Sequence, residues 1–392
     1  TRATTTGAVD LVNADKLTNK PLTNTAELLQ GVVPGMEIRR TNQGKVGEEG
    51  YDIRLRGVTS RSDPGILVVV DGIPYSDNNA NALNKINPQD IENITILKDA
   101  QAAIYGARAA GGVLLVTTKK GKTEKPTISY TGNFNFNTPA SVPQKVNVLQ
   151  HIEMMGELYA NDGISNHFFT HLLPYVNTAD IYSKNPEVVK GPFGDTPDLV
   201  LGWHDWWKEM YGTAFDHSHN LSISGGSEKS NYYASIGYLD QGSMFNYGEH
   251  NNKKYWGRFK YEYNLNKYIK LRSNVYVGRK KVTEPYDINQ LAWLTYWTWN
   301  CQPTFNPQGQ YYGSGGFGNP IAFAEHTGNR WKTYYSYYTQ LGFDITPLKN
   351  LTITGDMSLN YDISDEKYYR KRHQTYHWDG SLNYDVIDYW YS

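Results

Sequence analysis

The stretch Lys254-Tyr-Trp-Gly-Arg-Phe-Lys-Tyr-Glu-Tyr-Asn-Leu265 decides the fold of this 392-residue chain. One set of alternate positions carries Tyr255, Phe259, Tyr261, Tyr263 and Leu265, and the other carries Trp256, Arg258, Lys260, Glu262 and Asn264. Successive strand side chains point to opposite faces, so one face suits an apolar medium and the other a polar one. In a transmembrane barrel the outer face contacts lipid, the inner face lines a wet lumen, and about nine to eleven tilted residues cross the bilayer. The stretch therefore predicts one strand of a barrel wall.

Six further segments share this alternation, and their connections alternate in length. The seven strands are predicted at about 127–137, 216–225, 230–240, 253–265, 269–279, 333–345 and 351–363. Three connections are short turns, and three are long loops at about 138–215, 241–252 and 280–332. Outer-membrane barrels have short periplasmic turns and long extracellular loops, whereas a soluble sandwich has no reason to place its long loops at one end. We therefore expect a membrane wall, with Phe259, Leu341 and Met357 pointing outward and no second protein layer over them.

Composition excludes several other classes. The 38 Lys plus Arg balance 39 Asp plus Glu, so no basic stripe indicates nucleic acid. The mean hydropathy is −0.61, and the apolar runs are far too short for a spanning helix. The 32 Tyr and 10 Trp fit aromatic girdles at the membrane interfaces, although a soluble β-protein with tyrosine-lined sugar sites would also use them. Cys301 is the only cysteine, which excludes an intrachain disulfide and argues against a thiolate metal site.

Residues 1–122 predict a separate, mixed α+β domain ahead of the barrel wall at 123–392. Asn24 begins a helix that stops at Gly31, Asn87-Pro88 begins another, and Asp99 is expected to cap a third that ends at Gly106. Short strands are predicted at 53–56, 66–70, 94–97 and 113–117. A barrel that encloses such a domain needs about 22 strands, and bare strand edges are costly in lipid. We therefore expect the chain to be an incomplete barrel that stops at 389–391 without a terminal strand.

Ordered motifs in the first domain resemble the plug of TonB-dependent transporters. They are Leu28-Leu-Gln-Gly31, Pro34-Gly-Met36, Ile53-Arg-Leu-Arg-Gly57, Val68-Val-Val-Asp-Gly-Ile-Pro74, Ile86-Asn-Pro-Gln-Asp-Ile-Glu92 and the segment from Leu97-Lys-Asp-Ala to Gly-Gly-Val113. The Asp-Gly-Ile-Pro and Leu-Lys-Asp-Ala versions are similar to the SusC/RagA subfamily of the Bacteroidetes, as is the hairpin sequence at 220–229. The resemblance covers the plug and about the first third of a barrel.

This resemblance implies a fold and a function. The fold is an antiparallel membrane β-barrel of 22 strands, incomplete in this chain, with the plug inside its lumen. The function is TonB-dependent import of a nutrient across the bacterial outer membrane, with the plug facing the periplasm and the long loops extracellular. Implied partners are a SusD-like lipoprotein lid, TonB with ExbB and ExbD, outer-membrane lipid, and an oligosaccharide or peptide; a dimer of transporter–lid pairs is also compatible. No cofactor or metal is implied. The TonB box and the immunoglobulin-like extension that the resemblance leads us to expect would lie upstream of Thr1.

Candidate site residues follow from the motifs and from their surroundings. By analogy with the family, Arg54 and Arg56 would lock the plug by pairing with barrel carboxylates, although an ordinary surface ladder is the alternative. Residues predicted to be structural within the plug are Asp71, Gly72, Lys98, Asp99, Tyr105, Gly106 and Arg108. Residues that could stack on or hydrogen-bond a substrate are Tyr75, Asp77, Asn78, Asn79, Trp203, Trp206 and Trp207, each with a plain structural alternative. Residues 291–299 pose the same choice between a binding face and a loop core.

No arrangement of residues points to catalysis. His217 and His219 alternate on one strand without an evident third metal ligand, so a girdle position is the favoured interpretation. Gly-Lys-Thr at 121–123 lacks the glycine spacing of a phosphate-binding loop, and no nucleophile–base arrangement stands out. We therefore predict a transporter and not an enzyme. The rival classes are a soluble lectin-like protein and a polysaccharide-degrading enzyme; within transport, a peptide substrate is the alternative to a glycan.

Overall fold

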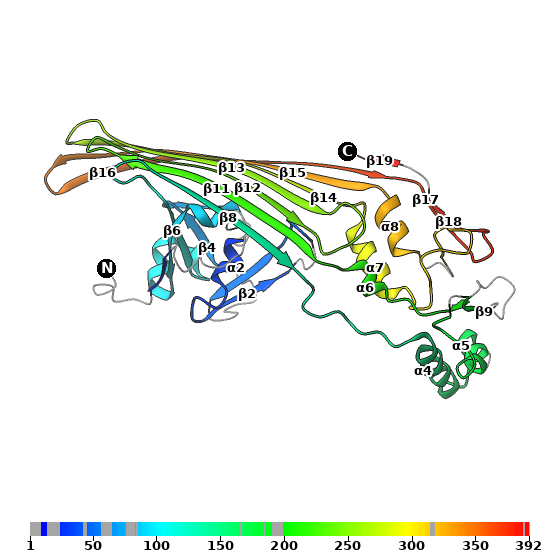
Figure 1. Cartoon of the computed structure of the whole chain (residues 1–392). Coiled ribbons are helices and arrows are strands. Elements are labelled where there is room, and N and C mark those ends of the chain that lie inside the picture. Colours follow the sequence, from blue (N-terminus) through cyan, green and yellow to red (C-terminus); the bar gives the residue numbers. More distant parts are fainter. Residues whose placement is uncertain are drawn as a thin grey trace.

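The computed structural model describes residues 9–13, 24–41, 45–55, 65–75, 83, 85–164, 167–183, 185–189, 199–313, 318–386 and 389–391. It contains a small N-terminal domain, a long curved sheet and a set of loop elements at one end of that sheet (Figure 1). Among the described residues, no helix has the length and apolar character needed to cross a membrane.

The N-terminal domain is built on a mixed five-stranded sheet in the order β1-β6-β7-β4-β5. Its strands are β1 (Val9–Asn13), β4 (Leu67–Val70), β5 (Ile73–Pro74), β6 (Ile91–Leu97) and β7 (Val113–Thr118). Strands β4 and β7 are parallel, and the other pairs are antiparallel. A separate hairpin joins β2 (Met36–Arg40) and β3 (Tyr51–Leu55). The predicted α+β plug fold is therefore present.

Local sequence signals explain the short helices of the plug. The Asn24 side chain accepts a hydrogen bond from the Ala26 N–H and so begins α2 (Thr25–Leu29), whose Leu28 is buried in the plug core. Asn87 caps the 3₁₀ helix η1 (Pro88–Asp90) in the same way. The predicted cap at Asp99 is wrong by one position, because Lys98 occupies the cap of η2 (Asp99–Tyr105) and makes no side-chain cap bond. A second 3₁₀ turn, η3 (Ala107–Ala109), follows.

The wall is a single antiparallel sheet in the order β19-β16-β15-β14-β13-β12-β11-β8. Its strands are β8 (Thr127–Asn137), β11 (Ala214–Gly226), β12 (Ser230–Gly242), β13 (Asn251–Asn264), β14 (Ile269–Pro285), β15 (Asn329–Leu348), β16 (Leu351–Arg370) and the short β19 (Tyr389–Tyr391). All seven predicted strands are confirmed. The expectation that no strand forms at 389–391 is wrong, because these residues pair with β16.

Several strands extend beyond their predicted ends on the long-loop side. Strand β15 begins at Asn329 and β16 continues to Arg370, whereas the alternation predicted 333–345 and 351–363. Backbone pairing between β15 and β16 needs no apolar face, so it continues past the point where outward apolar residues stop. The sequence pattern therefore marked the apolar band and not the full length of the strands.

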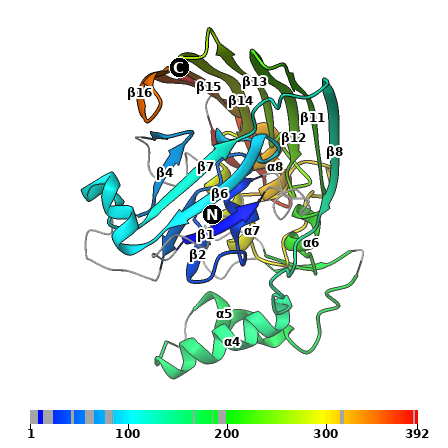
Figure 2. The ribbon, with the colours of Figure 1, turned by 90° about the vertical axis from the view of Figure 1, so that its left-hand side faces the viewer.

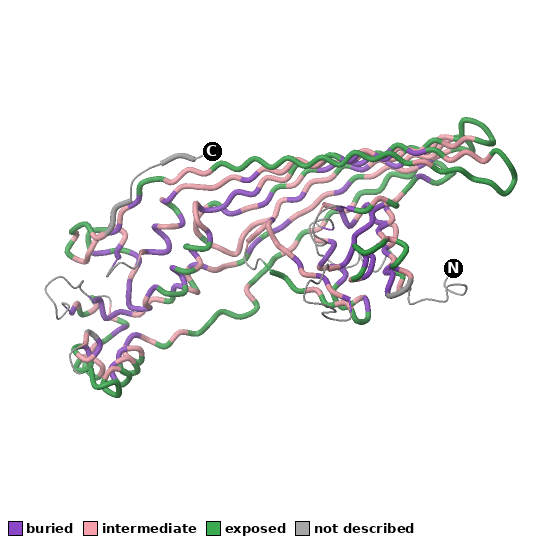
Figure 3. Tube along the Cα trace, turned by 180° about the vertical axis from the view of Figure 1, so that it is seen from behind, coloured by how far each residue is buried: buried purple, intermediate pink, exposed green. Residues whose placement is uncertain are grey.

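The two faces of the wall differ as predicted. Phe259, Leu341 and Met357 are 48%, 48% and 69% exposed, and no layer formed by the described residues covers them. The inward residues Trp256, Tyr276 and Tyr338 are buried. Seen along the strands, the sheet curves around the plug, which lies on its concave side (Figure 2). The burial pattern matches this arrangement, because exposed residues run along the outer strands while the plug core is buried (Figure 3).

The long connections fold into loop elements at one end of the wall (Figure 1). Those between β8 and β11 are α4 (Val148–Asn161), α5 (Phe168–Leu172), η4 (Leu173–Tyr175), β9 (Glu187–Val189), β10 (Leu199–Leu201) and α6 (Trp206–Met210). Those further along are α7 (Ile288–Trp297), α8 (Pro320–His326), β17 (His373–Tyr376) and β18 (Leu382–Val386). Helices α6, α7 and α8 share one buried cluster, so loops far apart in sequence form a common structure.

Candidate functional site

The turn between β4 and β5 binds the plug to two strands of the wall. Asp71 has a left-handed backbone (φ 48), and its carboxylate accepts hydrogen bonds from the backbone N–H and the hydroxyl of Thr118 (2.9 and 2.7 Å). From the wall, Lys260 Nζ lies 2.9 Å from Asp71 Oδ2, and the Asn274 amide donates to the same oxygen at 3.0 Å. Asp71 therefore closes a turn inside the plug and also ties that turn to β13 and β14.

A second contact buries a charge pair almost completely. Asp90 is fully buried at the end of η1 and accepts hydrogen bonds from the Tyr233 hydroxyl (2.8 Å) and the Ser235 hydroxyl (2.7 Å). Arg258 Nε lies 3.4 Å from Asp90 Oδ2, at ion-pair distance but without hydrogen-bond geometry. The Arg258 guanidinium also donates to Asn274 (3.1 Å). Because removal of either partner alone would leave a buried charge uncompensated, breaking this pair while the plug stays docked would be costly.

A third contact lies nearer the long-loop end of the wall. Glu48 accepts a hydrogen bond from Lys332 Nζ (2.5 Å) and from the Tyr334 hydroxyl (2.6 Å), both on β15. Burial alone would raise the pKa of Glu48, but the hydrogen bonds from Lys332 and Tyr334 outweigh it, so this pKa lies below the ordinary value of 4.5. The neighbouring carbonyl of Gly47 accepts from Lys280 Nζ (2.8 Å).

These contacts share one arrangement of charges, which the sequence motifs did not predict. At all three, a plug carboxylate meets a cation of the wall; the reverse arrangement occurs at Lys85, whose Nζ lies 2.8 Å from Asp362. Arg54 forms an ion pair with Asp52 on its own strand (2.9 Å), and Arg56 lies outside the described residues, so their assignment as the lock stays a prediction. A usable signal was present, because Arg258 and Lys260 lie on the polar face of 254–265, where enclosed cations require counter-ions.

The remaining plug motif residues make contacts within the plug. Lys98 Nζ lies 2.6 Å from Asp10 and donates to the Pro34 carbonyl (3.0 Å), and Arg108 donates to the Tyr75 carbonyl (3.1 Å). Gly72 and Gly106 have positive φ values of 88 and 76, which favour glycine at both turns. Tyr105 packs against a buried cluster of the plug that includes Leu67, Val69 and Leu97. The side chain of Asp99 is outside the described part of the structure.

A cavity of about 720 Å³ lies between the plug, the wall and the loops. Its plug side holds a charged chain in which Arg40 bridges Glu27 (3.7 Å) and Glu49 (3.3 Å), and Glu49 accepts from Gln241 on the wall (3.1 Å). Its loop side is formed by Tyr211 and by residues 288, 289 and 292 of α7. The cavity has both polar and apolar walls and is of the size that small-molecule sites usually have, and no single sequence motif marks it because segments from the plug, from several wall strands and from the loops build it.

The predicted substrate residues of the plug are only partly described. Tyr75 is buried and stacks on Tyr338 of the wall, with ring centroids 6.2 Å apart and an interplanar angle of 19°. Asp77, Asn78 and Asn79 lie outside the described residues. In this conformation the Tyr75 ring contacts the barrel wall, so its part in substrate binding stays a prediction.

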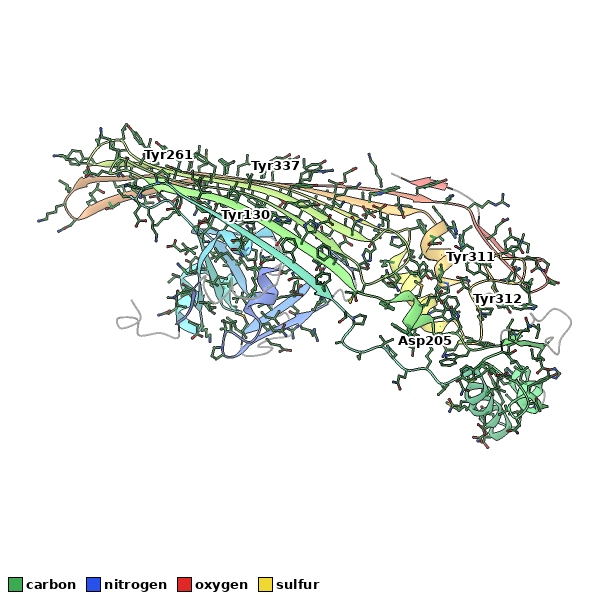
Figure 4. All side chains as sticks on the ribbon, in the orientation of Figure 1. Tyr130, Asp205, Tyr261, Tyr311, Tyr312 and Tyr337 are labelled. Carbon is green, nitrogen blue, oxygen red and sulfur yellow. The ribbon has the colours of Figure 1, made fainter. Side chains whose placement is uncertain are left out.

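The three tryptophans of the first long loop occupy different environments. Trp206 is fully buried, and its indole N–H donates to the Trp299 carbonyl (3.1 Å). Trp207 stacks on Tyr211 with centroids 5.0 Å apart, whereas Trp203 lines a second cavity of about 620 Å³ together with Phe305 and Trp378. Figure 4 shows the side chains of this loop region, with Asp205, Tyr311 and Tyr312 labelled at the end of the wall. Trp203 is therefore more accessible to a ligand than Trp206.

Residues 291–299 were predicted to form either a binding face or a loop core, and helix α7 contains some residues of each kind. Leu291 and Leu294 are buried in the loop core, whereas Trp293, Tyr296 and Trp297 are 45%, 58% and 50% exposed. Positions three and four apart lie on one side of a helix, so the three aromatic rings form one exposed face. This aromatic face belongs to the helix that also borders the larger cavity.

Comparisons with known proteins agree with this architecture. Residues 1–113 match the family model described as the TonB-dependent receptor plug domain. Over 61% of its own length, the chain is 33% identical to the TonB-dependent receptor SusC of Bacteroides thetaiotaomicron. Over 92% of its own length, it is 30% identical to the TonB-dependent receptor P26 of Formosa agariphila. These matches cover 21% and 34% of the relatives, so the chain spans about a third or less of their length. A structure of the RagAB peptide importer shares the fold over 94% of this chain and 42% of the other, with a TM-score of 0.72 at 24% identity.

Proposed function

Because this chain belongs to the SusC/RagA-type TonB-dependent receptors, we propose that it forms the plug and part of the wall of an active importer in the bacterial outer membrane. The observation that carries the proposal is a folded domain held against the polar inner face of a wall whose outer face is apolar. Residues 1–122 act as the movable plug and 123–392 as the wall. The short turns face the periplasm and the long loops face the exterior.

Transport needs the plug to be held firmly at rest and displaced when energy is supplied. The contacts at Asp71, Asp90 and Glu48 are polar and specific in geometry, so the plug has one defined resting position. A pull transmitted by TonB, energised by ExbB and ExbD, would break them together and open a path along the wall. The substrate would pass unmodified, since translocation requires no bond chemistry from the protein.

The proposed substrate is an oligosaccharide, captured beneath a SusD-like lipoprotein lid. Sugars bind through aromatic stacking and dense hydrogen bonding, and the exposed rings of α7 and the polar cavity beside that helix offer both. Lid binding would use the loop end of the wall, and a dimer of transporter–lid pairs is compatible with it. A peptide substrate is the second candidate, favoured by the fold likeness to the RagAB peptide importer.

Uptake measurements distinguish these alternatives. A strain that lacks its own copy and expresses the full-length transporter with its lipoprotein is supplied with labelled oligosaccharides or labelled peptides. We expect oligosaccharide uptake that disappears when ExbB is removed, whereas uptake of peptides alone would establish the second candidate. Uptake that persists without ExbB would refute energised import. Release of the protein from cells without detergent would favour a soluble lectin-like protein.

A further inference from the structure

The outward face of the wall carries three cations on two neighbouring strands. Lys253 of β13 is the register partner of Lys281 of β14, and Tyr255 is the partner of Arg279. Directly opposed residues have Cβ atoms about 4.5–5.5 Å apart, and diagonal neighbours about 7–8 Å apart. Lys253, Arg279 and Lys281 therefore form one compact group, which we call the outer basic cluster.

The outer basic cluster carries excess positive charge. Asp240 of β12 pairs with Lys253 (Nζ–Oδ2 3.6 Å) and also accepts a hydrogen bond from the Tyr238 hydroxyl. Among the described residues, neither Arg279 nor Lys281 has an ion-pair partner. Like charges placed directly opposite each other destabilise a sheet, so the cluster is best satisfied by an anion from outside the chain.

The position of the cluster identifies the level at which that anion would lie. Arg279 comes ten residues after Ile269, the first residue of β14, and the outward residues between them include Leu271, Val275 and Val277. Ten residues extend about 34 Å along a strand, or about 24 Å along the membrane normal at a tilt of about 45°. This height matches the apolar band of about 25 Å that outer-membrane barrels present to lipid. Arg279 therefore lies where the hydrocarbon ends on the long-loop side.

Tyrosines surround the cluster at the same level. Tyr255 is opposite Arg279 on one side, and Tyr335 of β15 is opposite it on the other. Tyr238 packs against Tyr255, with ring centroids 4.9 Å apart. Tyr337 of β15, labelled in Figure 4, is opposite Val277, next to this level, whereas Tyr261, opposite Ser273, lies further toward the short turns. Amphipathic rings beside cations provide an apolar support for acyl chains and donors for a head group.

We propose that the outer basic cluster binds the phosphate-bearing head group of an outer-leaflet lipid. The Arg279 guanidinium offers a planar pair of donors to phosphate, and Lys253 and Lys281 supply two further charges from the adjacent register position. The lipid's acyl chains would lie over Val277 and Val275, below the cluster. The site rests on the outward face contacting lipid, and it is independent of the plug and of the transported substrate.

The test measures lipid binding to the full-length transporter in detergent by native mass spectrometry. The probes are phosphorylated lipid A, the same lipid A with its phosphates removed, and inorganic phosphate. Each cation near an anionic lipid surface strengthens binding about fivefold, so the double substitution Arg279→Gln and Lys281→Gln should weaken binding of phosphorylated lipid A about thirtyfold. Lys367→Gln is the matched control, because Lys367 is an exposed outward lysine of β16 beside Asp365.

One outcome supports the proposal and three would overturn it. Strong binding of phosphorylated lipid A, lost in the double variant and retained in Lys367→Gln, supports it. Equal binding of dephosphorylated lipid A, or unchanged binding by the double variant, overturns it, as does inorganic phosphate binding as tightly as the lipid. Protease resistance of the plug shows that the variants fold, and their substrate uptake should equal that of the wild type. A failure here is therefore distinguishable from a failure of the import proposal.

Discussion

Replacing Asp90 by Asn in the full-length transporter should loosen the plug more than any other single neutral substitution at the plug surface. Asp90 is fully buried, the side chain of Arg258 is 4% exposed, and the carboxylate also accepts from Tyr233 and Ser235. Asparagine keeps the size of the side chain but removes the counter-ion of a buried guanidinium. Breaking one partner of such a pair typically costs about 3–5 kcal/mol.

This cost applies to the docked state, because an undocked Asp90 and Arg258 are both hydrated. The ratio of undocked to docked plug should therefore rise between about a hundredfold and a few thousandfold. The assay follows protease cleavage of the plug at increasing urea concentration, together with ion conductance of single transporters in planar bilayers. We expect cleavage at lower urea and frequent brief openings.

Two further variants control for non-specific damage. Asp52→Asn removes an ion-pair partner of Arg54 and of Arg39 inside the plug, where all three side chains are more than a quarter exposed, so the expected effect is below about 1 kcal/mol. Asp90→Leu combined with Arg258→Met removes both charges and should recover much of the lost resistance, since an apolar pair can replace a buried ion pair. Equal urea sensitivity of Asp90→Asn and the wild type, or of Asp90→Asn and Asp52→Asn, would refute the reasoning.

Three other predictions follow from the same structure. The pKa of Glu48 is lowered in the docked plug, so Glu48 contributes to docking above its ordinary pKa of 4.5, and this contribution is lost as the pH falls through the lowered value. Protection of the plug from protease should therefore drop in acid. In a protease titration, Glu48→Gln should abolish that part of the pH dependence. Asp71→Asn should keep the turn, because Asn also tolerates positive φ, but it should weaken docking by about 1–3 kcal/mol through loss of the ion pair with Lys260. If an Asp71→Val variant docked as well as Asp71→Asn, the role of the turn would be contradicted. Trp206→Ala should destabilise the loop region by about 3–5 kcal/mol in thermal unfolding, because its ring is fully buried. Trp297→Ala, at a half-exposed ring, should leave stability nearly unchanged and reduce substrate uptake. A larger loss of stability in Trp297→Ala than in Trp206→Ala would contradict this assignment of the buried ring.

The charge arrangement of the plug contacts bears on how such a plug is released. Wall cations and plug carboxylates lie at three separate levels along the strands, so no single displacement of one loop frees the domain. Because Asp71 lies on the turn that follows β4 and Asp90 on the helix that precedes β6, these two contacts restrain two elements of one sheet that lie on either side of β7. A force that unravels part of the sheet would therefore release both contacts.

The alternation of side chains along 254–265 was sufficient to predict the wall, because a strand exposes its two faces to different media whatever lies beside it. Similarly, the caps at Asn24 and Asn87 are local hydrogen bonds, so neighbouring residues alone determine them. The limits of β15 and β16 were not predictable in this way, because backbone pairing continues after the apolar face ends.

Only the tertiary structure decided which charges meet. Asp90 and Arg258 are separated by more than 160 positions, and neither residue by itself differs from an ordinary surface charge. The same holds for Glu48 with Lys332 and for the division of α7 into a buried face and an exposed aromatic face. Electrostatic pairing depends on the distance between two charges and on their burial, and both are set only when the plug lies against the wall. The sequence by itself determined that the wall has a polar inner face. The docked fold determined which plug residues pair with that face.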